Sequence, residues 1–253
     1  MQKSNPGLAF NEVKSYIMKK SISILPMNND INFLRNVSIF EELPERDLEK
    51  IAQLGTRKKF SKGNVILMED EIGSALFIII DGKVKVSRLD ETGKEVILSI
   101  LGPGEVFGEM SLLDGMKRSA TVSSLTDTEV FIIYRDDFLN LLNQHPQIAI
   151  SLLKELTQRL RKADMQIKSL SLKDAEGRIG CVLIMLADDL GKMYKGQVIV
   201  EGLPTQQDLA NMAGTSRETV SRILSKFEKR GLIKVEGKKL IILEYEKMKQ
   251  MFK

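Results

Sequence analysis

The sequence predicts an α+β protein in which three successive parts follow an N-terminal lead. Between residues 37 and 134, short β-rich segments alternate with glycines, a pattern typical of a sandwich or roll. From residue 146 the apolar residues take a helical heptad spacing, and from residue 174 helices and then a hairpin are indicated. We therefore expect an extension over 1–34, a jelly-roll-like β-roll over 35–145, a long helix over 146–173 and a winged helix-turn-helix over 174–253.

One cysteine and one histidine limit the chemistry of this chain of 253 residues. Cys181 alone can form neither an internal disulfide nor an iron–sulfur or Cys-rich zinc site, and we expect it to be a small buried apolar residue. A Ser-His-Asp triad would have to use His145, which directly precedes Pro146 with no nucleophile motif nearby. We therefore expect no enzyme activity and no metal.

The chain carries no sign of a membrane segment or of export. No apolar run approaches the length of a membrane span, and the N-terminus lacks a signal-peptide core. The formal net charge of +4 permits nucleic-acid binding without requiring it. A cytoplasmic protein without membrane contact is expected.

The first 134 residues divide into the lead and the β-rich part. The lead is interrupted by "SNPG" and "PMNND", which predicts a partly helical or loose extension of no deducible function. Six segments of strand character follow: "NVILMED", "ALFIII", "KVKVSRL", "EVILSIL", "SATVSSL" and "TEVFIIY". Because glycines separate them at near-regular spacing, these strands favour a roll.

The long helix has apolar residues at alternating steps of four and three. They are Ala149, Leu153, Leu156, Leu160, Ala163, Ile167 and Leu170. This is an a/d seam, and basic residues flank it. One interpretation is a helix that packs on its own domain; the favoured one is a parallel homodimer, since two-fold dimers are the commonest closed assemblies.

The C-terminal part shows the start and stop signals of two short helices. Asp174 can cap the helix "EGRIGCVLIMLADDL", and Thr205 with Asp208 forms a capping-box-like start for "QQDLANMA". Gly214 ends that helix, and Ser216 begins "RETVSRILSKFEKRG". A following segment, "LIKVEGKKLIIL", turns at Glu236-Gly237 as a small hairpin wing would.

The second of these helices separates an apolar stripe from charged residues. Arg217, Glu218 and Arg222 lie off the stripe of Val220, Ile223, Leu224 and Phe227, in the N-terminal half. Arginine matches guanine O6 and N7, and a carboxylate accepts from cytosine N4. Thr205, Ser216 and Lys238 complete the predicted DNA contacts, and Lys226, Lys229, Arg230, Lys234 and Lys239 can neutralise phosphates. The alternative, a merely solvated face, agrees less well with the turn, the caps and the basic wing.

Three segments resemble a known family. "TSRETVSRIL" resembles the recognition helix of the cyclic-AMP receptor protein/FNR (CRP/FNR) family of bacterial transcription regulators. "FGEMSLLDGMKRSATV", residues 107–122, resembles its phosphate-binding cassette, and "DAEGRIGCVLIMLAD" resembles the start of its DNA-binding domain. The resemblance spans roughly residues 37–243. It implies a β-roll sensor of the cyclic nucleotide-binding type, a dimerisation helix, a TGTGA-like palindromic DNA site, and double-stranded DNA, a second copy of the chain and RNA polymerase as partners.

The cassette also has a chemical logic of its own. Gly108 allows close backbone approach to a ligand, and Glu109, with Met110 next to it, can accept from a ribose hydroxyl. Arg118 and Ser119 can hold a phosphodiester. The alternative is a surface loop in which Glu109 and Arg118 pair with each other.

The resemblance breaks where the family contacts the base. The family's threonine-serine pair falls at Ala163 and Asp164, while Arg159 falls where the family has an arginine. Cyclic AMP is the first expectation. A guanine ligand read by the acceptor Asp164 is the second, and no nucleotide at all, with Asp164 paired to Arg161 or Lys168, is the third.

The resembling family also includes iron–sulfur and haem sensors, and the chain lacks the ligands that either would need. An iron–sulfur sensor needs several cysteines, and a haem sensor needs an axial ligand that His145, at the end of the domain, does not supply. A regulatory module acting on a protein partner is the remaining alternative, and the helix-turn-helix discriminates against it.

Overall fold

The structure is a computed structural model that describes residues 27–252. The expectation for residues 1–26 lies outside this range. The described part of the chain begins with three short helices, α2 (Met27–Leu34), the 3₁₀-helix η1 (Ser38–Phe40) and α3 (Glu45–Leu54). Ile31 and Leu34 of α2 are buried in a hydrophobic core that they share with Leu76 of the roll. Residues 27–34 therefore belong to the N-terminal domain and not to an extension. The extension predicted over 1–34 therefore does not cover these eight positions, because two apolar side chains spaced three apart share one helix face that packs into the core.

The predicted β-roll is confirmed as two four-stranded antiparallel sheets. Their strand orders are β1-β8-β3-β6 and β2-β7-β4-β5. The strands are β1 (Thr56–Phe60), β2 (Val65–Leu67), β3 (Ala75–Asp81), β4 (Val84–Leu89), β5 (Glu95–Leu101), β6 (Val106–Phe107), β7 (Thr121–Ser124) and β8 (Thr128–Tyr134). Two of these strands are not predicted from the sequence: β1, whose "TRKKF" is highly charged, and β6, which has two residues.

Strand β3 separates two cores. Leu76 and Ile78 point into the cluster shared with the surrounding helices, and Phe77 and Ile79 point into the cluster between the sheets. This alternation follows from the two-residue period of a strand. The Phe77 and Phe107 rings stack with centroids 5.1 Å apart. Phe107 directly precedes Gly108, so the start of the cassette is anchored in the inter-sheet core.

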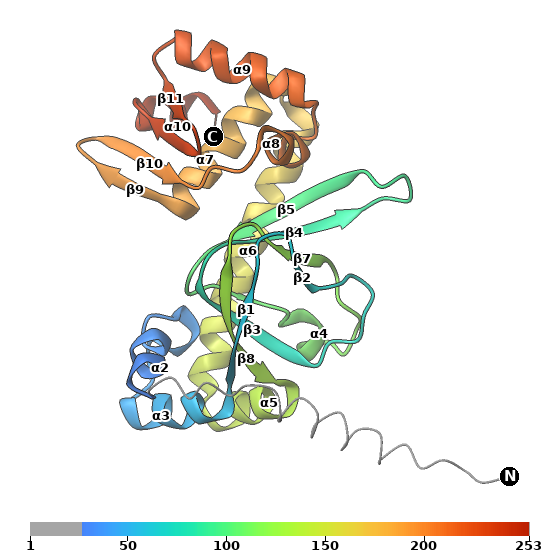
Figure 1. Ribbon diagram of the computed structural model, residues 1–253, viewed down its shortest axis with the longest axis vertical. Helices are drawn as coiled ribbons and strands as arrows, with labels where there is room; N and C mark the ends of the chain where they lie inside the picture. Colours follow the sequence, from blue (N-terminus) through green and yellow to red (C-terminus); the bar gives the residue numbers. More distant parts are fainter. Residues whose placement is uncertain (1–26, 253) are drawn as a thin grey trace, which may run out of the picture.

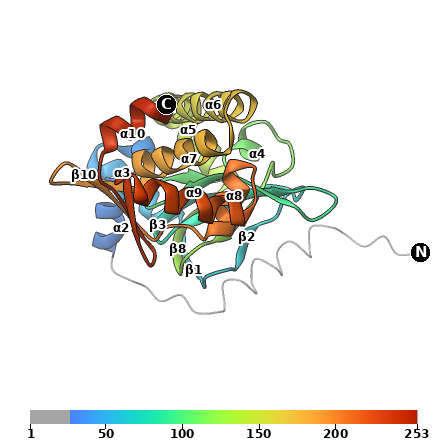
Figure 2. The same ribbon diagram turned by 90° about the horizontal axis from the view of Figure 1, so that it is seen from above.

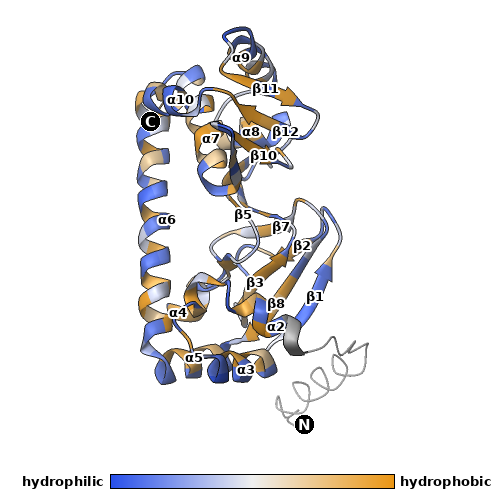
Figure 3. Ribbon diagram, turned by 90° about the vertical axis from the view of Figure 1, so that its left-hand side faces the viewer, coloured by the Kyte–Doolittle hydropathy of each residue, from blue (hydrophilic) through white to orange (hydrophobic). Residues whose placement is uncertain are grey.

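Two helices follow the roll. Helix α5 (Arg135–Gln144) starts eleven residues before the expected change to helix, and it ends at His145, after which α6 (Pro146–Leu172) begins with proline in its first turn. Figure 3 shows α6 as a column that runs past both domains. The side chains of Ile148 and Leu152 in α6 are buried in the core between the roll and its helices. Four members of the predicted seam are exposed instead: Leu153, Leu160, Ile167 and Leu170. Leu153, Leu160 and Ile167 therefore leave most of their surface open to a partner, and Leu170 lies half-exposed beside the C-terminal domain.

The C-terminal domain contains the predicted winged helix-turn-helix and more. Its elements are α7 (Ala175–Leu190), β9 (Gly191–Tyr194), β10 (Gln197–Glu201), α8 (Gln206–Ala213), α9 (Arg217–Lys229), β11 (Ile233–Glu236), β12 (Lys239–Ile242) and α10 (Tyr245–Phe252). The wing is one sheet of order β11-β12-β10-β9, so the expected single hairpin is extended by a second. Glu236 pairs with Lys239, which moves the turn to Gly237 and Lys238, one residue later than expected.

The two domains touch through the β4–β5 hairpin. Figure 1 shows this hairpin beneath α8, and Figure 2 shows α8 and α9 lying over the strands, with α6 and α10 along one edge. Ile97 and Ile100 of β5 belong to the core cluster of the C-terminal domain. Within residues 27–252, no helix is both long enough and apolar enough to cross a membrane.

Candidate functional site

The cassette begins at a glycine whose conformation other residues rarely adopt. Gly108 joins β6 to α4 (Met110–Leu113) with a φ of +83°. A Cβ at this position would lie 2.7 Å from Arg118 Nη1 and 3.2 Å from the Ala75 carbonyl oxygen. Glycine is therefore required both by the backbone and by the arginine packed against it.

Arg118 is buried beneath the cassette, with only 5% of its surface exposed. It donates from Nη1 to the Gly108 carbonyl (2.5 Å) and to Ser111 Oγ (2.8 Å), and from Nη2 to the Ala75 carbonyl (2.8 Å). Among residues 27–252, no carboxylate lies within ion-pair distance of it. Burial lowers the pKa of Arg118, and the carboxylates of Glu109 and Glu71 oppose that shift. The guanidinium is thus a buried cation held by neutral acceptors, a natural partner for an anion.

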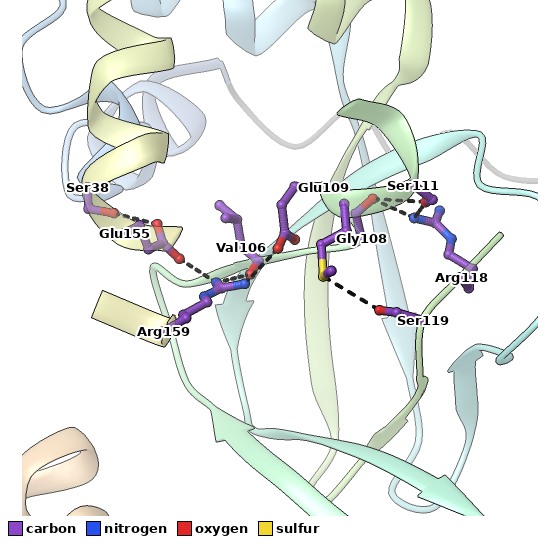
Figure 4. Close-up of polar contacts among 10 residues, drawn as sticks. Ser38, Val106, Gly108, Glu109, Ser111, Arg118, Ser119, Glu155 and Arg159 are labelled. Carbon is purple, nitrogen blue, oxygen red and sulfur yellow. Dashed lines mark hydrogen bonds and ion pairs between the residues drawn. The ribbon is translucent and has the colours of Figure 1, made fainter. Parts of the chain in front are cut away.

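Glu109 faces the long helix instead of Arg118. Only 3% of the residue is exposed, and its Oε1 accepts from Arg159 Nη1 at 2.9 Å. Arg159 also donates to Glu155 and to the Val106 carbonyl. Burial raises the pKa of Glu109, and the charge of Arg159 opposes this. The alternative in which Glu109 and Arg118 pair with each other is therefore excluded, and Figure 4 shows two separate polar clusters.

The two remaining cassette residues are exposed. Met110 is 49% exposed, and Ser119 Oγ donates to its sulfur at 3.6 Å. The structure thus gathers six of the seven predicted ligand residues around the cassette: Gly108, Glu109, Met110, Arg118, Ser119 and Arg159. The structure adds Ser111, which was not predicted. Its position three residues after Gly108, at the start of a helix, is the signal that could have identified it.

Asp164 is the seventh predicted residue, and the structure does not bring it to the cassette of its own chain. Asp164 lies five positions after Arg159, which places the two side chains about 140° apart around the helix. Its side chain is exposed. Among the described residues it forms no ion pair with Arg161 or Lys168. It lies on the far side of the exposed seam of α6.

The helix-turn-helix is built by the predicted caps. Thr205 Oγ1 accepts from the Asp208 amide at 3.1 Å while Asp208 Oδ2 accepts from the Thr205 amide at 3.1 Å, which completes the capping box of α8. Ser216 accepts from the Thr219 amide at 3.2 Å and caps α9. Between them Gly214 takes a left-handed φ of 58°, and a Cβ there would lie 3.1 Å from Leu170 of α6. The turn therefore sits against the end of the long helix.

The exposed face of α9 forms a groove. Val220, Ile223, Leu224 and Phe227 are buried as predicted. The groove is lined by Gln206, Arg217, Glu218, Ser221, Arg222 and Ser225, three of which (Gln206, Ser221 and Ser225) were not predicted. A hydrogen bond from its own backbone amide, followed by one from Ser216, lowers the pKa of Glu218. Its carboxylate is therefore ionised and can accept a hydrogen bond.

Ion pairs within the domain divide the predicted phosphate contacts into two groups. Lys226 and Arg230 pair with Glu176, Lys234 pairs with Glu236, and Lys239 pairs with Glu201 at 3.5 Å. Among the described residues, Lys229 and Lys238 have no such pair, and Lys238 stands exposed in the hairpin turn. These two are the cations most available to a phosphate.

Clusters of metal-ligand residue types and the single cysteine were the remaining candidates for a site. Within residues 27–252, no group of three or more His, Cys, Asp and Glu residues is arranged to hold a metal ion. Cys181 is half-buried, and its thiol donates to the Phe252 carbonyl at 2.7 Å.

Comparisons with known proteins agree with this arrangement. Residues 57–145 match the cyclic nucleotide-binding domain family, and residues 177–251 match the Crp-like helix-turn-helix domain family. The chain is 34% identical over 203 residues to the cyclic AMP receptor protein of Thermus thermophilus, covering 80% of this chain and 90% of the relative. It is 35% identical over 189 residues to a CRP-like cAMP-activated global transcriptional regulator of Mycobacterium tuberculosis, covering 75% and 84%.

Solved structures show the same fold. FixK2 from Bradyrhizobium japonicum superposes with a TM-score of 0.70 at 23% identity, over 79% of this chain and 98% of that chain. A CooA mutant from Carboxydothermus hydrogenoformans superposes with a TM-score of 0.68 at 24% identity, over 81% and 90%. The chain therefore belongs to the CRP/FNR family of DNA-binding transcription regulators, with a cyclic nucleotide-binding domain followed by a Crp-like helix-turn-helix domain.

Proposed function

We propose that the protein is a homodimeric, cyclic AMP-gated regulator that binds a palindromic DNA site and contacts RNA polymerase in the cytoplasm. The observation that carries the effector is Arg118, a buried cation whose hydrogen-bond acceptors are all neutral. The relatives named as cyclic AMP receptors or cAMP-activated regulators support a cyclic nucleotide, and cyclic AMP first among them.

The effector binds by exchanging hydrogen bonds inside the cassette. Its phosphodiester takes the donors that Arg118 now gives to Gly108 and Ser111, with Ser119 as a second donor. A ribose hydroxyl donates to Glu109, which then shares Arg159 with the ligand. The exchange at Arg118 replaces neutral acceptors by an anion, and hydrogen bonds between charged groups are the stronger ones.

The homodimer forms along α6. Leu153, Leu160, Ile167 and Leu170 are 52% to 63% exposed in the single chain, a continuous apolar stripe that needs a partner. A second copy of the same stripe fits, since knobs-into-holes packing is self-complementary at a two-fold axis. Leu160→Glu is expected to shift the protein to monomer in sedimentation velocity, whereas Gln158→Glu, off the stripe, leaves the dimer intact.

The DNA site is read by the groove of α9. Arg217 and Arg222 each match a guanine and Glu218 a cytosine, which suits a TGTGA-like half-site. Thr205, Ser216 and Lys238 contact phosphates. Half-sites about one helical turn apart follow from known dimers of this motif, members of this family included.

Ligand and DNA are coupled through α6 and the hinge near Asp174. The ligand lies against Arg159, and the helix-turn-helix turn lies against Leu170 at the other end of the same helix. A ligand can shift the orientation of α9 only if it prefers one of two states, and operator DNA must then tighten ligand binding by the same factor.

One experiment tests the effector. Purified full-length protein is titrated by calorimetry with cyclic AMP, cyclic GMP and cyclic dinucleotides, with and without operator DNA. We expect cyclic AMP to bind most tightly, and more tightly still with operator. Failure of every nucleotide to bind would leave the DNA-binding regulator without this effector.

A further inference from the structure

The C-terminal domain rests on the sensor through an interface that includes a polar cluster. Lys85 and Glu95 belong to the β4–β5 hairpin of the sensor, and Asp208 and Asn211 belong to α8. Beside them, Ile97 of β5 is only 2% exposed and shares a core cluster with Leu209 of α8. The hairpin is therefore packed into the DNA-binding domain and does not merely approach it.

The cluster joins two charges of the sensor to two polar groups of α8. Lys85 Nζ lies 2.7 Å from Glu95 Oε1 and 3.6 Å from Asp208 Oδ1. Asn211 Nδ2 donates to Glu95 Oε2 at 3.0 Å. The charged side chains of Lys85, Glu95 and Asp208 are only 13% to 21% exposed. Partly buried pairs of this kind are screened less than surface pairs and are sensitive to orientation.

Asp208 serves both domains at once. Its Oδ2 caps α8 through Thr205, and its Oδ1 faces Lys85 of the sensor. Thr205 begins the first helix of the helix-turn-helix, which in turn positions α9. The carboxylate that fixes the start of the DNA-reading unit is therefore also a sensor contact.

We propose that Lys85, Glu95, Asp208 and Asn211 form an interdomain latch that holds the helix-turn-helix in one orientation on the sensor. Its opening or closing is a step by which the sensor sets DNA affinity, and this second part rests on the proposed function. The contact requires one particular placement of the two domains, so any state with α9 differently oriented loses it. Lys83, which donates to the Glu201 carbonyl, and the Lys162–Asp189 pair lie at other points of the interface.

The sharpest variant exchanges the two hairpin charges, Lys85→Glu with Glu95→Lys. The pair inside the hairpin is kept with reversed sign, while a carboxylate at position 85 now faces Asp208 and an ammonium at position 95 faces the amide of Asn211. The hairpin thus stays paired and the contact with Asp208 becomes repulsive, whereas Asn211 can turn its amide oxygen toward the ammonium, so the loss is expected at Asp208. Arg88→Ala is the matched control, because Arg88 lies on the same strand and pairs with Glu69 inside the sensor at 2.7 Å.

Hydrogen exchange of the full-length, effector-free protein decides whether the latch exists. In the exchanged-charge variant we expect amides of α8 and of β5 to exchange about fivefold or more faster, because local opening becomes easier. Arg88→Ala is expected to leave α8 unchanged, and Asn211→Ala to give a smaller acceleration in the same segments. Unchanged exchange in the swapped variant, or equal acceleration of α8 by Arg88→Ala, overturns the latch.

DNA titration then decides whether the latch regulates. The ratio of operator affinity with cyclic AMP to that without it is expected to fall toward one in the exchanged-charge variant, and to stay at the parent value in Arg88→Ala. A parent ratio in the swapped variant overturns the regulatory role. If the parent protein itself does not respond to cyclic AMP, the effector is wrong, and the exchange result still decides the latch.

Discussion

The cassette and helix α9 both carry arginines that we expect to meet a polar partner, but the fold holds these arginines in opposite ways. Arg118 is 5% exposed, and protein acceptors occupy both of its terminal nitrogens. Arg217 and Arg222 are exposed along an open groove. A ligand at the cassette would therefore meet an arginine that is already hydrogen-bonded to protein, whereas a ligand at the α9 surface would displace only water.

The contrast between a buried and a solvent-exposed arginine leads us to expect different roles for the two sites. An exchange inside a buried cluster moves the groups that were bonded before, so ligand binding at the cassette is linked to the positions of Gly108 and Ser111. A solvated helix face binds without rearranging itself, so its specificity comes from matching base edges. Regulation is thus expected at the first site and sequence discrimination at the second.

The largest expected effect is at Arg118. Arg118→Lys keeps the charge but cannot reach two acceptors with a planar fork, and we expect cyclic AMP affinity to fall roughly 100-fold, the loss of about 3 kcal/mol for a charged hydrogen bond. Calorimetry checks this, and thermal unfolding shows whether the fold survives. Arg88→Ala, which removes an exposed arginine of the same domain, should leave the affinity unchanged. Equal affinity in Arg118→Lys would contradict a buried anion site.

The second largest effect is expected at Glu109, whose pKa is raised by burial. A ribose hydroxyl donates best to an ionised carboxylate, so affinity should fall as the pH drops through the pKa of Glu109. Because burial raises this pKa above the ordinary 4.5, the loss begins at a higher pH than for a solvent-exposed glutamate. Glu109→Gln should weaken binding roughly 10-fold at neutral pH and flatten the profile, since hydrogen bonds to charged groups contribute about 1.5–3 kcal/mol. A pH profile that persists in Glu109→Gln would assign the titration to another group.

A smaller effect is expected at Arg222, one of the exposed arginines of α9. Arg222→Ala should cost about 1–3 kcal/mol on the specific site and little on random DNA, because a bidentate base contact is lost. Lys229→Ala, which removes a cation of the same helix, should weaken both DNAs alike and reduce the salt dependence. Fluorescence anisotropy with both DNAs measures the ratio. An unchanged ratio in Arg222→Ala would show that Arg222 does not read a base.

The smallest effect is expected at Asp164. This side chain faces away from its own cassette, so a base that it reads must be held by the partner subunit. An ionised carboxylate meets two donors on guanine but one on adenine, so Asp164→Ala should cost cyclic GMP a few-fold more than cyclic AMP, about 0.5–1.5 kcal/mol for one hydrogen bond. Parallel titrations with both nucleotides give the selectivity. If Asp164→Ala leaves it unchanged, the base is not read there.

Much of the DNA-reading unit could be predicted because its signals are local. Thr205 with Asp208, and Ser216 with Thr219, form their hydrogen bonds three residues apart, a range that one helical turn spans. The strands missed in the sensor had no such signal. Strand β1 reads as a charged segment, and it is a strand because Thr56 to Phe60 pair with β8, some seventy residues later.

The sequence alone therefore determined the order of the parts, the caps, the apolar stripes and the residue types of both sites, since each of these depends on neighbours along the chain. The partners inside the sites depended on the tertiary structure. Arg159 reaches Glu109 across 50 residues, and Asp208 reaches Lys85 from another domain. Coulomb attraction and burial act through space, so these contacts follow from how the sheets, α6 and α8 are placed, which no spacing along the chain reveals.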